Sequence, residues 1–166
     1  MYPVIYGYQE ATKKVEKLIE DEYYPEALVV SMFIVEKTLR RTLKQLIVSA
    51  GFTSKYANII LRGLKGFASI KKAWELYDPA HAKLSNIIQP TDLKLFQDVA
   101  TQRNKLIHGE RTYDELVCRQ QAENIMRALG RVKVTFDTRY GYSGWSKPSI
   151  RRKSTLHSDP KVRVDY

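Results

Sequence analysis

Apolar residues recur at every third or fourth position along most of this chain, the spacing that places them on one face of an α-helix. The pattern predicts a first helix over residues 9–22 and a second over residues 25–50, with Pro25 in its first turn and Gly51 as its C-terminal stop. The second helix carries a regular apolar stripe, which we expect to face the interior of a bundle: Leu28, Met32, Val35, Leu39, Leu43, Leu46 and Ile47.

The middle of the chain gives shorter patterns. They predict a helix over residues 54–64, capped by Ser54, and another over residues 69–77. Beyond Pro90, Thr91 and Asp92 are expected to cap a strong helix that runs to residue 108 and ends at Gly109. Its apolar stripe consists of Leu95, Phe96, Val99, Ala100, Leu106 and Ile107.

The last long pattern begins near Asp114 and leaves two interpretations of its second half. Gly130 and the alternation over residues 132–136 are compatible with a strand. One stripe at helical spacing favours a single helix that continues towards residue 140: Cys118, Ile125, Leu129, Val132, Phe136 and Tyr140. We therefore expect an all-α chain, a bundle of four to six helices.

The composition changes from residue 143 onward. This stretch has a net charge of +4 and contains Gly144, Pro148 and Pro160, which predicts an extended basic tail. The expected organisation is a helical domain over residues 1–142 and a tail over residues 143–166. Aromatic residues precede three basic residues here, a combination that stacks bases and neutralises phosphates; the alternative is that the aromatic rings pack on the bundle. The residues concerned are Tyr140, Tyr142, Trp145, Arg151, Arg152 and Lys153.

Composition and charge narrow the classes of function. The chain has 166 residues, one cysteine and a formal net charge of +10, which fits a single domain and excludes a disulfide framework. Residues 27–35 form the longest apolar run, far short of the roughly 20 residues that span a membrane. The N-terminus lacks the pattern of a secretory signal, so we expect a cytoplasmic protein. No spacing predicts a metal site, no glycine-rich phosphate loop is present, and we expect no cofactor. The positive charge favours an anionic partner, of which nucleic acid is the commonest.

Two charged residues fall on apolar stripes. Arg103 lies at the centre of the stripe that precedes Gly109, and Glu36 lies near the middle of the stripe of the second helix. A buried guanidinium without a partner is strongly disfavoured. One hypothesis is that Glu36 pairs with Arg103 inside the bundle. The alternative is that Arg103 faces a groove or a subunit interface, where it meets a ligand phosphate.

Arg103 also begins a recognisable motif. The segment Arg103-Asn104-Lys105-Leu106-Ile107-His108 resembles the Arg-polar-x-x-x-His signature of the HEPN superfamily. Gly109 after the motif, its place in a late helix and a preceding long helix that carries Glu36 are also similar to that family. Asn104 and His108 are four residues apart and so share one helical face.

The resemblance implies a helical bundle that dimerises and brings two motif helices together at the interface. Many members of the family are metal-independent endoribonucleases that act as toxins, phage-defence effectors or RNA-processing modules. By position, Arg103, Asn104 and His108 would form the active site, and Lys105 and Arg111 would contact RNA. RNA is cleaved without a metal when a 2′-hydroxyl attacks the adjacent phosphate, which leaves a 2′,3′-cyclic phosphate.

Other members of the family have lost activity and serve as scaffolds. A catalytically silent helical module that binds RNA or a protein partner is therefore the alternative function. An antitoxin or another defence protein is a further expected partner. In HEPN toxins that are paired with nucleotidyltransferase antitoxins, a tyrosine two residues after the histidine receives AMP. Glu110 occupies that position here, and the nearest tyrosine is Tyr113, so silencing by adenylylation is not expected.

Overall fold

The computed structural model describes residues 7–110 and 113–145. All regular structure in this part of the chain is helical, as the hydrophobic pattern predicts. The elements are α1 (Tyr8–Glu20), α2 (Tyr24–Ser49), α3 (Ser54–Gly63), α4 (Gly66–Tyr77), α5 (Leu84–Ile87), α6 (Pro90–Ile107) and α7 (Glu115–Tyr140). The expected number of four to six helices is too low, because α5 is a single turn and too short to show a period.

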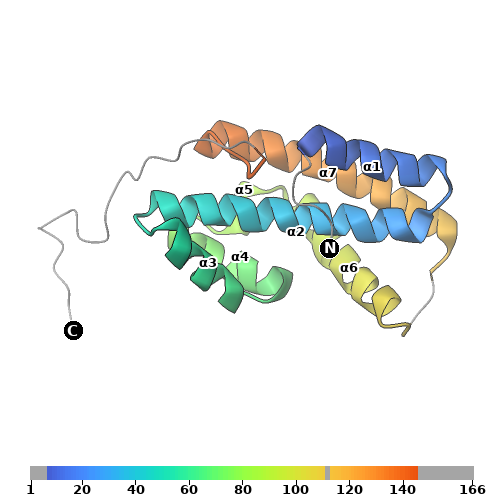
Figure 1. Ribbon diagram of the computed structural model, residues 1–166, viewed down its shortest axis with the longest axis horizontal. Helices are drawn as coiled ribbons and strands as arrows, with labels where there is room; N and C mark the ends of the chain where they lie inside the picture. Colours follow the sequence, from blue (N-terminus) through green and yellow to red (C-terminus); the bar gives the residue numbers. More distant parts are fainter. Residues whose placement is uncertain (1–6, 111–112, 146–166) are drawn as a thin grey trace, which may run out of the picture.

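Helix α2 organises the described part of the molecule. It packs most extensively against α7, and it also contacts α1, α3, α4 and α6. Figure 1 shows α1 and α7 along one side of α2, with α3, α4 and α6 on the other side. Helix α6 runs obliquely to α2, so its C-terminal end projects from the bundle. None of the described helices combines the length and the apolar character needed to cross a membrane.

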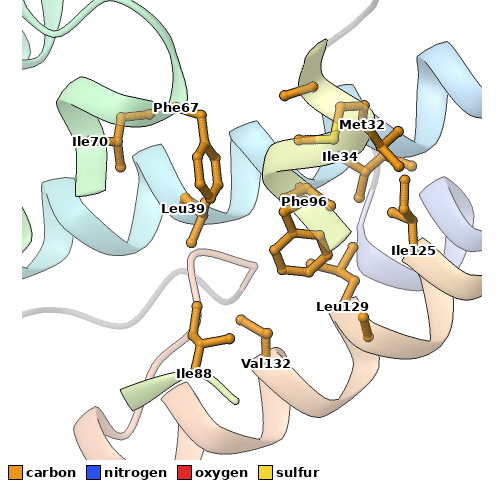
Figure 2. Close-up of a cluster of buried hydrophobic side chains, with 14 of the residues drawn as sticks. Met32, Ile34, Leu39, Phe67, Ile70, Ile88, Phe96, Ile125, Leu129 and Val132 are labelled. Atoms are coloured by element: carbon orange, nitrogen blue, oxygen red, sulfur yellow. The ribbon is translucent and has the colours of Figure 1, made fainter. Parts of the chain in front are cut away.

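The apolar stripe predicted for α2 forms the centre of the core. All seven of its residues are buried. In Figure 2 the Phe96 ring of α6 points towards Leu129 of α7, and Phe67 of α4 lies over Leu39 of α2. Burying apolar side chains of this size contributes roughly 1.5–3 kcal/mol each. The core therefore fixes α6 against both α2 and α7.

Helix α7 continues through Gly130, which confirms the helical interpretation and excludes the strand. Cys118, Val132 and Phe136 of its predicted stripe are buried. The helix ends at Gly141, whose φ of 79° is the left-handed conformation that glycine adopts without strain.

Two predicted helix caps are wrong. Thr53, not Ser54, caps α3, because its side chain accepts a hydrogen bond from the Tyr56 amide at 3.3 Å. Asp92 does not cap α6, which begins at Pro90. Instead, the buried Asp92 carboxylate accepts two hydrogen bonds, at 2.6 and 2.9 Å, from Arg131 of α7. A tertiary ion pair thus takes the place of the predicted local cap.

The C-terminal end of α7 is joined to the α4–α5 connection by a buried carboxylate. Asp78 accepts hydrogen bonds from Arg139, from the Tyr140 hydroxyl and from the amides of Ala80 and Ala82. Burial raises the pKa of Asp78, but these donors together outweigh burial and lower the pKa to about 2. Burial is the main cause that raises the pKa of Tyr140, and the bond to Asp78 adds to it.

The segment Ser143–Trp145, which the composition assigned to the tail, packs on α2. Ser143 and Gly144 are buried. The Gly144 amide donates to Gln45 Oε1 at 2.8 Å, and Trp145 Nε1 donates to Thr38 Oγ1 at 2.8 Å. The predicted boundary at 142/143 therefore does not mark the end of the packed chain. The basic residues Arg151, Arg152 and Lys153 lie outside the described residues.

Candidate active site

The end of α6 has a regular helix stop that places His108. The Gly109 amide donates to the Leu106 carbonyl at 3.2 Å and the Glu110 amide to the Lys105 carbonyl at 2.9 Å. Gly109 has a φ of 67°, so its left-handed conformation turns the chain away from the helix axis. His108 is thus the C-cap of α6.

Arg103 and Glu36 form a two-pronged ion pair, as the helical-wheel hypothesis predicted. Arg103 Nη1 donates to Glu36 Oε2 at 3.0 Å, and Arg103 Nη2 donates to Glu36 Oε1 at 2.9 Å. The side chain of Arg103 is 11% exposed and that of Glu36 is 20% exposed. The pair is therefore largely buried but reaches the surface, so the second hypothesis, in which Arg103 faces a groove or an interface, is compatible with the same geometry.

Two further contacts fix the guanidinium of Arg103. Its Nε donates to Asn104 Oδ1 at 3.2 Å, and its central carbon lies 5.4 Å from the centre of the Phe33 ring. An arginine over an aromatic face is stabilised by the ring quadrupole. A guanidinium has five N–H donors, and three of them are used here.

Asn104 and His108 are both exposed. The Asn104 side chain accepts a hydrogen bond from Arg103, not from His108. Its amide nitrogen keeps two N–H donors. No hydrogen bond to the His108 ring occurs within residues 7–110 and 113–145. The imidazole is thus placed by the backbone alone and is open to an incoming group.

The predicted apolar stripe of α6 is wrong at its C-terminal end. Phe96, Val99 and Ala100 are buried as expected, but Leu106 is only half-buried and Ile107 is 53% exposed. The reason is that the C-terminal end of α6 projects from the bundle (Figure 1). The projecting turn therefore presents apolar surface as well as the polar residues of the motif.

Phe33 is a site residue that the sequence analysis missed. Its ring is 43% exposed and contacts the Arg103 guanidinium. An available signal was its place on α2, one turn before Glu36 and outside the apolar stripe. A large apolar side chain on the polar face of an amphipathic helix indicates a contact other than the core.

The structure describes one of the other residues that were predicted to bind RNA. Lys105 is half-buried on the last turn of α6. Arg111 lies outside the described residues. Within the described residues, no three His, Cys, Asp or Glu side chains are grouped so that they could hold a metal ion.

The described site thus combines an arginine fixed between a carboxylate, an amide and an aromatic ring with an exposed histidine five residues later on the same helix. Such a set can neutralise a phosphate and transfer a proton. Comparison of the chain with models of protein families, with curated proteins and with solved structures finds no match.

Proposed function

We propose that this chain is a metal-independent endoribonuclease of the HEPN type, with Arg103, Asn104 and His108 as its catalytic residues. The observation that best supports the proposal is the way in which Arg103 is held near His108. Its guanidinium is held by Glu36 and Asn104 close to the surface, and His108 ends the same helix as an exposed side chain. A purely structural ion pair would explain Arg103, but it gives no role to an exposed histidine placed by a glycine stop.

The proposed reaction is an internal transfer within RNA. The 2′-hydroxyl loses its proton to His108 and attacks the adjacent phosphorus. The bond to the 5′-oxygen then breaks, and that oxygen takes a proton. General acid–base catalysis of this type contributes roughly 10²–10⁴-fold. The positive charge of Arg103 stabilises the non-bridging oxygens, whose negative charge grows in the transition state. The products are a 2′,3′-cyclic phosphate and a 5′-hydroxyl.

Asn104 has two roles in this proposal. Its oxygen accepts from Arg103 Nε, which helps to hold the guanidinium plane. Its amide nitrogen remains available to donate to a phosphate oxygen. Asn104 therefore acts both as a support for Arg103 and as a second phosphate contact.

The reaction needs a base and an acid, and a homodimer supplies both. Phe33 and Ile107 are exposed apolar residues on the two helices that form the site. Burying such residues against a second copy would release water from both. Two copies of His108 would then face one phosphate, one as base and the other as acid. The proposed assembly is a homodimer with a composite active site.

The biological role that fits this activity is that of a toxin or a phage-defence effector, with an antitoxin or another defence protein as its partner. The formal net charge of +10 favours RNA as the substrate, because phosphate contacts supply most of non-specific affinity. We propose a cytoplasmic location, since that is where such substrates are found.

Cleavage of RNA in the presence of EDTA tests the proposal. Purified protein is incubated with structured and unstructured RNA beside the His108→Ala variant, which changes only an exposed side chain. The proposal predicts cleavage by the wild type alone and a 2′,3′-cyclic phosphate at the new end. Equal cleavage by both proteins would point to a contaminating nuclease and would remove the enzyme assignment.

A second candidate function is a catalytically inactive RNA-binding or protein-interaction module. The observation that favours it is that Glu36 already neutralises Arg103 in the described structure. This alternative predicts that wild type and His108→Ala bind RNA equally, with a steep dependence on salt, and that neither cleaves it.

A further inference from the structure

A small pocket lies between α1, α2 and the segment Ser143–Trp145, next to the candidate active site. Its volume is about 70 Å³. Two aromatic residues, Phe33 and Trp145, line it together with Lys37. The remaining lining is mostly apolar: Ala11, Lys14, Val30 and Ile34.

The Trp145 ring is held in a fixed position at this pocket. Its Nε1 donates to Thr38 Oγ1 at 2.8 Å, and the Tyr8 ring meets it edge-on with 5.6 Å between the ring centres. Gly144 before it approaches α2 so closely that a Cβ atom would lie 2.7 Å from the Cβ of Arg41. The ring is thus pre-positioned, although it is only half-buried.

Two cations stand over the same indole ring. Lys37 Nζ lies 5.5 Å and the Arg41 guanidinium carbon 5.7 Å from its centre. Neither of them has a carboxylate partner within residues 7–110 and 113–145. Like charges one helical turn apart repel each other. Burial and the charge of Arg41 lower the pKa of Lys37. An anion bound here would remove this repulsion.

Phe33 connects the pocket to the candidate active site. Phe33 lines the pocket, and the Arg103 guanidinium lies 5.4 Å from the centre of its ring. Among the charged residues after Phe33 on α2, Lys37 and Arg41 lie over the Trp145 ring. Arg40 instead donates to the Leu61 and Leu64 carbonyls at the end of α3. Glu36 is neutralised by Arg103, so the surface from Arg103 to Trp145 is aromatic and positively charged.

We propose that this pocket binds one unstacked nucleobase of single-stranded RNA, which stacks on Trp145 while Lys37 and Arg41 contact the neighbouring phosphate. The inference rests on the proposed function, because it extends the same RNA strand from Arg103 along α2. Aromatic rings that stack bases beside cations that follow the backbone are the usual means of binding single strands.

The size of the pocket agrees with this occupant. Sites for complete cofactors or drug-sized ligands measure about 300–1,000 Å³, whereas a planar base needs only to insert its edge.

Tryptophan fluorescence offers a direct test. The chain has two tryptophans; Trp74 is fully buried and stacked on Phe136, so only Trp145 is accessible to a base. The probe is a 2′-O-methyl hexaadenylate, which binds as RNA does but has no free 2′-hydroxyl to attack. A hexamer of the same backbone without bases is the control. The proposal predicts that the first oligomer quenches the emission of the wild type and that the abasic oligomer does not.

Variants of Trp145 and Lys37 show which residue gives the fluorescence quench and which residues contribute to RNA binding. In Trp145→Phe the quench disappears while binding, measured by fluorescence anisotropy, persists. Trp145→Leu, which cannot stack, weakens binding about tenfold. Lys37→Gln lowers the slope of log Kd against log salt concentration by about one. The matched control is Lys55→Gln, which removes an exposed lysine on α3 that does not line the pocket. It leaves the quench and that slope unchanged.

Several outcomes would overturn the inference. They are the absence of a quench when anisotropy shows saturated binding, an equal quench by the abasic oligomer, and no binding of either oligomer. Capture of a protein segment in this pocket, in a form that nucleotides do not displace, would also overturn it. Because the probe is not cleaved, the result is independent of catalysis. A wild type that cleaves RNA but shows no quench would refute this inference alone, and a quench without cleavage of RNA would refute the enzyme assignment alone.

Discussion

The carboxylate of Glu36 on α2 binds both terminal nitrogens of Arg103 on α6, at 2.9 and 3.0 Å, across 67 positions of the sequence. The cation that we propose for phosphate binding is therefore already paired in the absence of substrate. Such a pair fixes the guanidinium plane, which favours binding of a phosphate in one orientation. It also lowers the long-range attraction of Arg103 for RNA, so other cations must supply that attraction.

Substitution of Glu36 tests how much this ion pair stabilises the fold. Glu36→Ala leaves a largely buried guanidinium without its partner, which should lower the free energy of unfolding by about 3 kcal/mol. For a chain of this length, that corresponds to a fall in Tm of roughly 10 °C. Thermal unfolding followed by circular dichroism measures it. As a control, Asp21→Ala breaks the exposed pair between Lys17 and Asp21 and should leave the Tm nearly unchanged. An unchanged Tm in Glu36→Ala would refute a stabilising role.

Gly144→Ala should release Trp145 from α2. Gly144 has a φ of 81°, and an added Cβ would lie 2.7 Å from Arg41 Cβ and 3.1 Å from the Thr38 carbonyl oxygen. We expect a loss of more than about 1 kcal/mol from the backbone conformation alone. The Trp145 emission should shift to longer wavelength as the ring becomes solvated. Gly63→Ala is the matched control, because nothing lies within 4 Å of its added Cβ. It should be neutral or slightly stabilising. Equal effects of the two substitutions would contradict the packing of this segment.

Asp78 makes stability depend on pH in the acid range. Its pKa is lowered from 3.8 to about 2 in the folded chain. A carboxyl whose folded-state pKa is depressed contributes stability above its unfolded pKa, and that stability is lost as the pH falls towards 2. We expect a contribution of about 1–2 kcal/mol at neutral pH. Urea unfolding of wild type and Asp78→Asn between pH 6 and pH 2 measures it. The difference between the two proteins should shrink as the pH falls; a constant difference would show that the charge of Asp78 is not involved.

A composite active site predicts a specific loss of activity when wild-type and His108→Ala chains form mixed dimers. If wild-type and His108→Ala chains are co-expressed in equal amounts and pair at random, about a quarter of the dimers contain two wild-type chains. When both copies of His108 serve one phosphate, activity should fall to about a quarter of that of the wild type. Separately tagged chains allow the three dimers to be purified and assayed. An activity near one half, with active mixed dimers, would show that each chain cleaves RNA independently.

The sequence predicted those parts of the fold that depend on local period and on glycine geometry. The stripe from Leu28 to Ile47 predicted the buried face of α2, and Gly109 predicted the end of α6. The Glu36–Arg103 pair was also predictable, because two opposite charges on apolar faces need each other. These features are set by residues close in sequence or by a strong energetic demand.

The remaining features depend on tertiary geometry that no local pattern contains. Asp92 was expected to cap a helix, but its partner is Arg131, 39 positions away. Ile107 belongs to an apolar stripe and is exposed because α6 projects beyond the helices that bury its first turns. Trp145 was grouped with a tail because composition changes near it, although Gly144 and Thr38 hold it on α2.

The central claim is that His108 and Arg103 cleave RNA through its own 2′-hydroxyl. The most direct measurement compares one RNA with the same sequence methylated at every 2′-oxygen, both in EDTA, with wild type, His108→Ala and Arg103→Lys. The account predicts cleavage only of the unmodified RNA and only by the wild type, with a 2′,3′-cyclic phosphate on the product. Cleavage of the methylated RNA, or undiminished cleavage by His108→Ala, would contradict it.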